Sequence, residues 1–70
     1  MEVKISKRLK ELRKAKTLNQ REIAKAIGVS QNSYCLWETG RTYPTPENLM
    51  ELCKYFDVSA DYLLGLTDTI

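Results

Sequence analysis

Two adjacent carboxamides, Gln31 and Asn32, are the side chains of this sequence with the most specific chemistry. A carboxamide carries a donor and an acceptor side by side, so it can form paired hydrogen bonds with N6 and N7 of an adenine. Ser33 adds a further polar group, and Leu36, one helical turn beyond Asn32, is suited to contact with a thymine methyl group. The pattern favours the reading of base edges in a DNA groove. The alternative is that both amides are ordinary surface groups.

The sequence lacks histidine, the side chain that most often serves as a general base near neutral pH. The 70-residue chain has no histidine, and its two cysteines, Cys35 and Cys53, stand alone. These residues assemble neither a nucleophile–base pair nor a Cys/His zinc site, so we expect no catalysis, no metal and no cofactor. Cys53 falls on an apolar helical stripe and is expected in the core. Cys35, on the side of the amides, is interpreted as a space-filling residue in preference to a redox switch.

The amides need a rigid support, and residues 20–39 have the pattern of one. The pattern is a helix, a turn of about three residues, and a second helix from Gln31 to Thr39. Ala24 is small enough to let two helices cross closely, and Gly28 permits the sharp turn. Val29 can then fill the gap between the helices. This unit is a helix-turn-helix.

Tyr34 and Trp37, three positions apart, share one face of the second helix. We interpret them as core anchors in preference to stacking platforms for bases. The opposite face then carries the side chains with chemical potential, which are Gln31, Asn32, Cys35 and Leu36. A helix held at its back, with amides near its N-terminal end, is suited to the major groove of DNA.

Capping signals divide the chain into five short helices. Ile5, Leu9 and Leu12 form an apolar stripe that predicts a first helix from about residue 4 to 15. The residues expected to cap the later helices at their N-terminal ends are Asn19, Ser30, Thr45 and Ser59, and those expected to end helices are Gly28, Gly40 and Gly65. No stretch alternates with period two for long enough to form a strand. The predicted fold class is therefore all-α.

Composition and charge agree with a small soluble domain that faces a polyanion. Hydrophobic residues make up 43% of the chain, which favours one globular domain over residues 1–70. Residues 1–45 hold ten Lys and Arg against four Glu, a net charge of +6, whereas residues 46–70 hold one Lys against five acids, a net charge of −4. The alternative is that these charges are simply scattered over the solvent-exposed faces of small helices. A basic face toward DNA, with an acidic side turned away, is the more specific interpretation.

The chain resembles the Cro/repressor (Xre-like) family of helix-turn-helix DNA-binding domains. The resemblance covers nearly the whole chain and lies in the order and spacing of four segments: Leu18-Asn19-Gln20-Arg21-Glu22-Ile23-Ala24, Gly28-Val29-Ser30-Gln31-Asn32-Ser33, Trp37-Glu38-Thr39-Gly40-Arg41 and Asp57-Val58-Ser59-Ala60-Asp61-Tyr62-Leu63-Leu64. It implies a five-helix, lambda-repressor-like domain. In this family the helix corresponding to Gln31–Thr39 enters the major groove, usually in a dimer.

The resemblance also implies roles for individual residues. Gln20 and Arg41 match positions that contact backbone phosphates. Arg13 and Glu38 match a pair in which the glutamate holds the arginine, so Arg13 is expected to be structural first and a phosphate contact second. Gln31 and Asn32 match base-reading positions, and Ser33 matches a nearby polar contact.

Two positions depart from the family pattern. Thr17 stands where many relatives have glycine or asparagine, which implies a strained or altered end of the first helix. Leu36 stands where the family is often polar, which argues against a hydrogen-bonded base contact there.

Our leading hypothesis is a sequence-specific transcriptional regulator, a repressor of phage or bacterial origin, that binds a double-stranded DNA operator. Affinity from so small a module favours a homodimer on two half-sites. The dimer surface is expected at the C-terminal end, where apolar residues exceed what a small core can absorb, namely Val58, Leu64, Leu66 and Ile70.

The alternative is a protein-interaction module, antitoxin-like or anti-repressor, that keeps the fold. The sequence predicts no small-molecule ligand and no membrane association. With no signal peptide and no disulfide framework, a cytoplasmic location is expected in either case.

Overall fold

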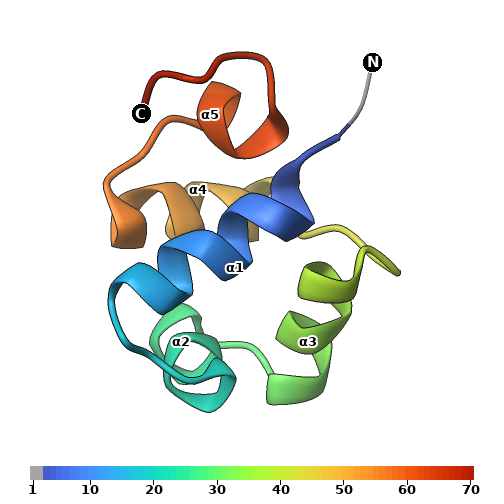
Figure 1. Ribbon diagram of the computed structural model, residues 1–70. Helices are drawn as coiled ribbons and strands as arrows, with labels where there is room; N and C mark the ends of the chain where they lie inside the picture. Colours follow the sequence, from blue (N-terminus) through green and yellow to red (C-terminus); the bar gives the residue numbers. More distant parts are fainter. Residues whose placement is uncertain (1–2) are drawn as a thin grey trace.

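The computed structural model describes residues 3–70, and all five predicted helices are present (Figure 1). The first begins one residue later than its apolar stripe suggests. No strand occurs among the described residues. None of the helices is long and apolar enough to cross a membrane. The helices are α1 (Ile5–Ala15), α2 (Gln20–Ile27), α3 (Gln31–Thr39), α4 (Pro46–Phe56) and α5 (Ala60–Leu64).

The predicted caps account for where α2 to α5 begin. Each of the four cap side chains accepts a hydrogen bond from the backbone N–H three residues later, and so satisfies a donor that the helix leaves free. Asn19 completes a capping box, because the Glu22 side chain also accepts the Asn19 backbone N–H at 2.9 Å. Pro46 occupies the first turn of α4, where a missing N–H costs nothing.

The helices enclose one hydrophobic core, with α1 through its middle. α1 contacts both α3 and α5, while α2 packs on α3 and α4. Figure 1 shows α1 crossing the centre of the molecule, with α2 and α3 below it and α5 above. The buried apolar side chains are Ile5, Leu9, Ile23, Ala24, Tyr34, Trp37, Leu52, Phe56, Val58 and Leu63.

Arg8 is a charged residue inside this arrangement. Its guanidinium donates hydrogen bonds to the backbone carbonyls of Tyr62 and Thr67 and to the carboxylate of Asp68. It also lies over the Tyr62 ring, 4.2 Å from the ring centre, in cation–π geometry. Arg8 thereby fastens the segment after α5 to α1. The Arg8 side chain is 9% exposed, and its charge is engaged within the chain by two carbonyls and by the exposed carboxylate of Asp68.

The C-terminal apolar residues divide into two groups, and one expectation needs correction. Val58 is not surplus to the core: it is 8% exposed and belongs to the core cluster. Leu64 is half-buried against the same cluster. Leu66 and Ile70 are 56% and 64% exposed. Val58 is buried because it lies in the turn between α4 and α5, where its backbone N–H donates to the carbonyl of Cys53 at 3.0 Å and its side chain joins the core cluster.

Thr17 ends α1 in a strained conformation, as its departure from the family pattern implies. Its φ is 55°, in the left-handed region, where a β-branched side chain crowds the backbone. The Thr17 N–H donates to the carbonyl of Lys14 and the next N–H, of Leu18, donates to that of Arg13. These bonds satisfy the last carbonyls of α1, and they hold the unfavourable backbone in place.

We therefore expect Thr17→Gly to stabilise the protein by about 1 kcal/mol, since relief of strain exceeds the entropy that glycine adds to the unfolded chain. In a domain this small, the melting temperature should rise by about 4–8 °C. Thermal unfolding followed by circular dichroism measures this. Thr42→Gly is the control, because Thr42 is exposed and does not have positive φ, and it should not stabilise. An unchanged or lower melting temperature in Thr17→Gly would contradict the strain.

Candidate nucleic-acid interface

The two amides singled out by the sequence lie together on the exposed side of α3. Gln31 and Asn32 occupy its first turn and are both exposed. Ser33 is half-buried, and its hydroxyl oxygen accepts a hydrogen bond from the Ser30 hydroxyl at 2.9 Å. Leu36, one turn beyond Asn32, is half-buried. The start of α3 therefore offers free donors and acceptors next to an apolar side chain.

The opposite side of α3 holds the helix rigidly in the core. Tyr34 and Trp37 are buried, and their rings meet edge to face with centres 5.8 Å apart. Before α3, Gly28 takes a left-handed φ of 88°, and the N–H of Val29 donates to the carbonyl of Ala24 at 2.9 Å. Ala24 is buried and Val29 packs against the core. The turn between α2 and α3 is thus fixed at both ends.

A buried ion pair joins the C-terminal end of α3 to α1. Arg13 donates to both carboxylate oxygens of Glu38, from Nε to Oε2 at 2.7 Å and from Nη2 to Oε1 at 3.0 Å. Its remaining terminal nitrogen, Nη1, donates to the carbonyl of Leu18 at 2.9 Å. The two side chains are 12% and 3% exposed. Arg13 is therefore engaged inside the protein on all three of its nitrogens.

Gln20 brings a third helix into the same network. Its Nε2 donates to Glu38 Oε1 at 3.1 Å, so the start of α2 is tied to the end of α3. Sequence reasoning assigned Gln20 only to a phosphate and missed this bond. The signal for it was indirect, because a buried carboxylate with two oxygens needs more donors than one arginine supplies.

The network changes the ionisation of its members. Burial alone would raise the pKa of Glu38, but hydrogen bonds, first of all from Arg13, outweigh it and hold that pKa below the ordinary value of 4.5. The Tyr34 hydroxyl is enclosed beside this pair and has no hydrogen-bond partner among residues 3–70. Burial, and then the nearby Glu38 carboxylate, raises the pKa of Tyr34 well above its ordinary range. Glu38 is thus held charged and Tyr34 neutral at physiological pH.

The loop that follows α3 carries the predicted phosphate contact Arg41. The Arg41 side chain is exposed and forms no ion pair within the described part of the chain. Its backbone N–H donates to the carbonyl of Leu36 at 3.0 Å, which fixes the loop to the last turn of α3. Among the ten basic residues of the N-terminal part, Arg8 and Arg13 are engaged internally. Arg41, just beyond the C-terminal end of α3, is exposed and takes part in none of the ion pairs found among residues 3–70.

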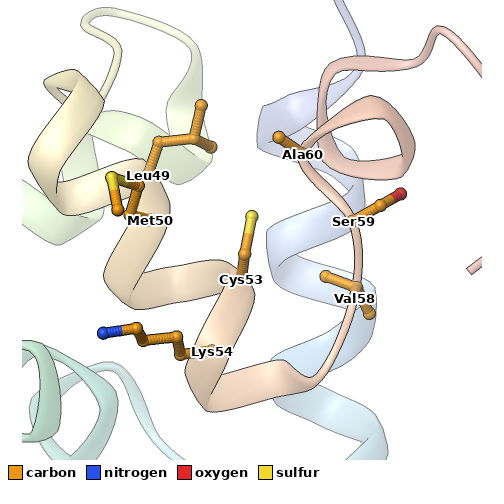
Figure 2. A pocket seen from close by; sticks show the side chains of 7 residues that line it. All are labelled: Leu49, Met50, Cys53, Lys54, Val58, Ser59 and Ala60. Carbon is orange, nitrogen blue, oxygen red and sulfur yellow. The ribbon is translucent and has the colours of Figure 1, made fainter.

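A hollow elsewhere on the molecule contains none of the expected DNA contacts. It has a volume of about 320 Å³ and lies between α4 and the beginning of α5 (Figure 2). Figure 2 shows Cys53 between Leu49 on one side and Val58 on the other. Burial raises the pKa of the Cys53 thiol, as its place on the apolar stripe predicts. The hollow is an apolar surface feature of the half of the chain with net negative charge.

Comparison with known proteins identifies the family. The model of the Helix-turn-helix family matches residues 9–63, which is most of the chain. The chain belongs to this family. The match includes α2, α3 and the turn between them, so the helix-turn-helix predicted from residues 20–39 is confirmed.

Curated relatives of this helix-turn-helix chain include bacterial and phage regulators. It is 43% identical over 61 residues to an uncharacterized HTH-type transcriptional regulator, YobD, of Bacillus subtilis. It is 40% identical over 63 residues to the cryptic phage CTXphi transcriptional repressor RstR of Vibrio cholerae. These alignments cover 87% and 90% of the chain but 54% and 56% of the relatives. The chain thus spans about half the length of the curated relatives it matches.

A solved structure of the same fold is the c2 repressor of Salmonella phage P22, in complex with a synthetic operator. It superposes with a TM-score of 0.82 at 37% identity, over 86% of this chain and 91% of the repressor chain. The fold is therefore the five-helix, repressor-like helix-turn-helix fold that the sequence resemblance implied.

The ion pair between α1 and α3 gives a pH-dependent prediction. Because the pKa of Glu38 is lower in the folded chain than in the unfolded one, its stabilisation is complete above about pH 4.5 and is lost as the pH falls through the folded value. Glu38→Gln should lower the free energy of unfolding by roughly 2–4 kcal/mol at pH 7, because Arg13 loses its charged partner. This difference should shrink below pH 4.5. Urea unfolding at pH 3 to 7 measures it.

Glu11→Gln removes an exposed carboxylate of α1 and serves as the control. It should change the free energy of unfolding by at most about 0.5 kcal/mol. A Glu38→Gln deficit that stays constant from pH 7 to pH 3 would show that the carboxylate charge does not carry the effect.

Proposed function

We propose that this chain binds double-stranded DNA sequence-specifically by inserting α3 into the major groove, and that it regulates transcription as a repressor of phage or bacterial origin. The observation that carries the proposal is the division of α3 into two sides. One side is fixed in the core by Tyr34 and Trp37, and the other presents the exposed side chains of Gln31 and Asn32, which form no side-chain hydrogen bond within residues 3–70. The related P22 c2 repressor, which was solved in complex with a synthetic operator, supports DNA binding by a chain of this fold.

We assign the exposed side chains to two kinds of DNA contact, with base edges and with backbone phosphates. Base edges are assigned to the side chains Gln31, Asn32, Ser33 and Leu36. Phosphates are assigned to Arg41 and to Gln20, whose amide keeps a second N–H beyond its bond to Glu38. Arg13 acts chiefly by holding Glu38, because its nitrogens are already engaged. Phosphate contacts then give affinity and register, while the α3 side chains select sequence.

Two copies of the chain on neighbouring half-sites are the assembly we propose. A single module of this size covers little DNA, and a dimer doubles the contacts. Leu66 and Ile70, exposed in the segment after α5, supply apolar surface for such pairing. In this assignment residues 1–70 form one DNA-binding domain acting in the cytoplasm.

A first test separates phosphate contact from sequence selection. Affinity for duplex DNA should fall at least tenfold between about 50 and 200 mM salt, because bound cationic side chains release counterions. Arg41→Gln should weaken binding equally on all sequences and reduce the slope of log affinity against log salt by about 1. Fluorescence anisotropy measures both. Absence of binding even at 50 mM salt would favour the alternative function, a protein-interaction module.

The second test uses Gln31→Ala. Loss of a paired contact with one base should cost about 1–3 kcal/mol on the preferred operator and change binding to random DNA little. The operator is obtained by selecting bound duplexes from a random pool. Arg41→Gln is the matched comparison, since its loss should be the same on both DNAs. Equal losses on both DNAs with Gln31→Ala would remove Gln31 from base recognition.

A further inference from the structure

Leu36 is a half-buried leucine that the hydrophobic core does not use. The core consists of ten buried side chains with seven partly buried apolar ones packed against it, and Leu36 belongs to neither set. Cys35 is outside both sets as well. Leucine side chains in a small domain normally contribute to the core, because burial of apolar surface stabilises the fold. The part of the Leu36 side chain that stays exposed is therefore available for another contact.

Its position places that contact beside the exposed amides. Leu36 follows Asn32 by four residues and Cys35 follows Gln31 by four, so both lie on the same side of α3 as the amides. The backbone around Leu36 is fixed, since its carbonyl accepts the N–H groups of Arg41 and Thr42. The exposed side of α3 thus carries a polar first turn followed by an apolar second turn.

A leucine can distinguish bases in the major groove in only one way. It has no donor or acceptor, so it cannot separate the O4 acceptor of thymine from the N4 donor of cytosine by a hydrogen bond. It can gain energy from the methyl group on C5 of a pyrimidine. To such a side chain, 5-methylcytosine resembles thymine, whereas cytosine and uracil lack the group being read.

We propose that Leu36 makes operator recognition depend on a pyrimidine C5-methyl group, so that the protein accepts thymine or 5-methylcytosine at one position of each half-site and discriminates against unmethylated cytosine. This inference rests on the proposed DNA-binding function. It adds that cytosine methylation can create or strengthen a binding site. Burial of one methyl group corresponds to about fourfold in affinity for each half-site.

The experiment begins with a duplex selected from random DNA by the unmodified protein. Each thymine of that duplex is replaced in turn by deoxyuridine, which removes only the methyl group. We expect one position in each half-site at which affinity falls about fourfold. At this position the T·A pair is then replaced by C·G or by 5-methyl-C·G, and the ratio of the two affinities is measured. The ratio should be about four in favour of the methylated pair.

Three variants assign the effect to its residue. Leu36→Ala should reduce the methylated-to-unmethylated ratio to near one, and Leu36→Met, which stays apolar, should keep most of it. Met50→Ala, which shortens an exposed apolar side chain of α4, should leave the ratio unchanged. Each variant is judged by the ratio of its own affinities for the methylated and the unmethylated duplex. A substitution that weakens binding to both duplexes equally leaves this ratio unchanged.

The outcomes separate this inference from the proposed function. Failure to select any duplex would overturn both. A selected duplex that is bound tightly, but with no thymine sensitive to deoxyuridine or with a methyl preference that survives Leu36→Ala, would overturn the role of Leu36 and leave DNA binding intact.

Discussion

The bidentate ion pair between Arg13 and Glu38 is the interaction on which the site depends. It is nearly closed to solvent, and it joins α1, the start of α2 through Gln20, and the end of α3. Without it, the C-terminal end of α3 would lose its charged attachment to α1 and to the start of α2. A helix that presents two neighbouring amides to base edges together must keep its orientation to within about 10–20°. A bidentate charged pair adds a directional constraint to the one that the packing of Tyr34 and Trp37 provides.

Most of the helical architecture could be predicted because its signals are local. Each of the caps Asn19, Ser30, Thr45 and Ser59 accepts a hydrogen bond from a backbone N–H only three residues away. Each glycine that ends a helix sets the backbone angles at its own position. A short stretch of sequence therefore contains both partners of each interaction. The exposed side of α3 followed from spacing alone. Once Tyr34 and Trp37 are assigned to the core, helical geometry leaves the amides outside.

The contacts that escaped prediction are those between distant residues. Arg8 is surrounded in sequence by Lys7 and Lys10 and has the appearance of another solvated charge, but its partners lie 54 to 60 positions away. Val58 was assigned to the surface, although it is buried in the core. The number of apolar side chains that a small core can absorb depends on how the helices cross, and no local sequence pattern encodes that crossing. The net charge of +6 for residues 1–45 overstates the positive charge that can face DNA, because Arg8 and Arg13 are turned inward.

The fastening of α1 by Arg8 also bears on how the protein is made. All the hydrogen-bond acceptors that the structure gives the Arg8 guanidinium belong to residues 62–68, so during synthesis this charge is without these partners until that segment has been made. An arginine without acceptors stays in water and keeps its side of α1 from being buried. The final packing of α1 against α5 therefore requires the segment that holds residues 62–68. A chain that stops before this segment leaves the Arg8 side of α1 in water, so the first and the last helix of the fold complete each other.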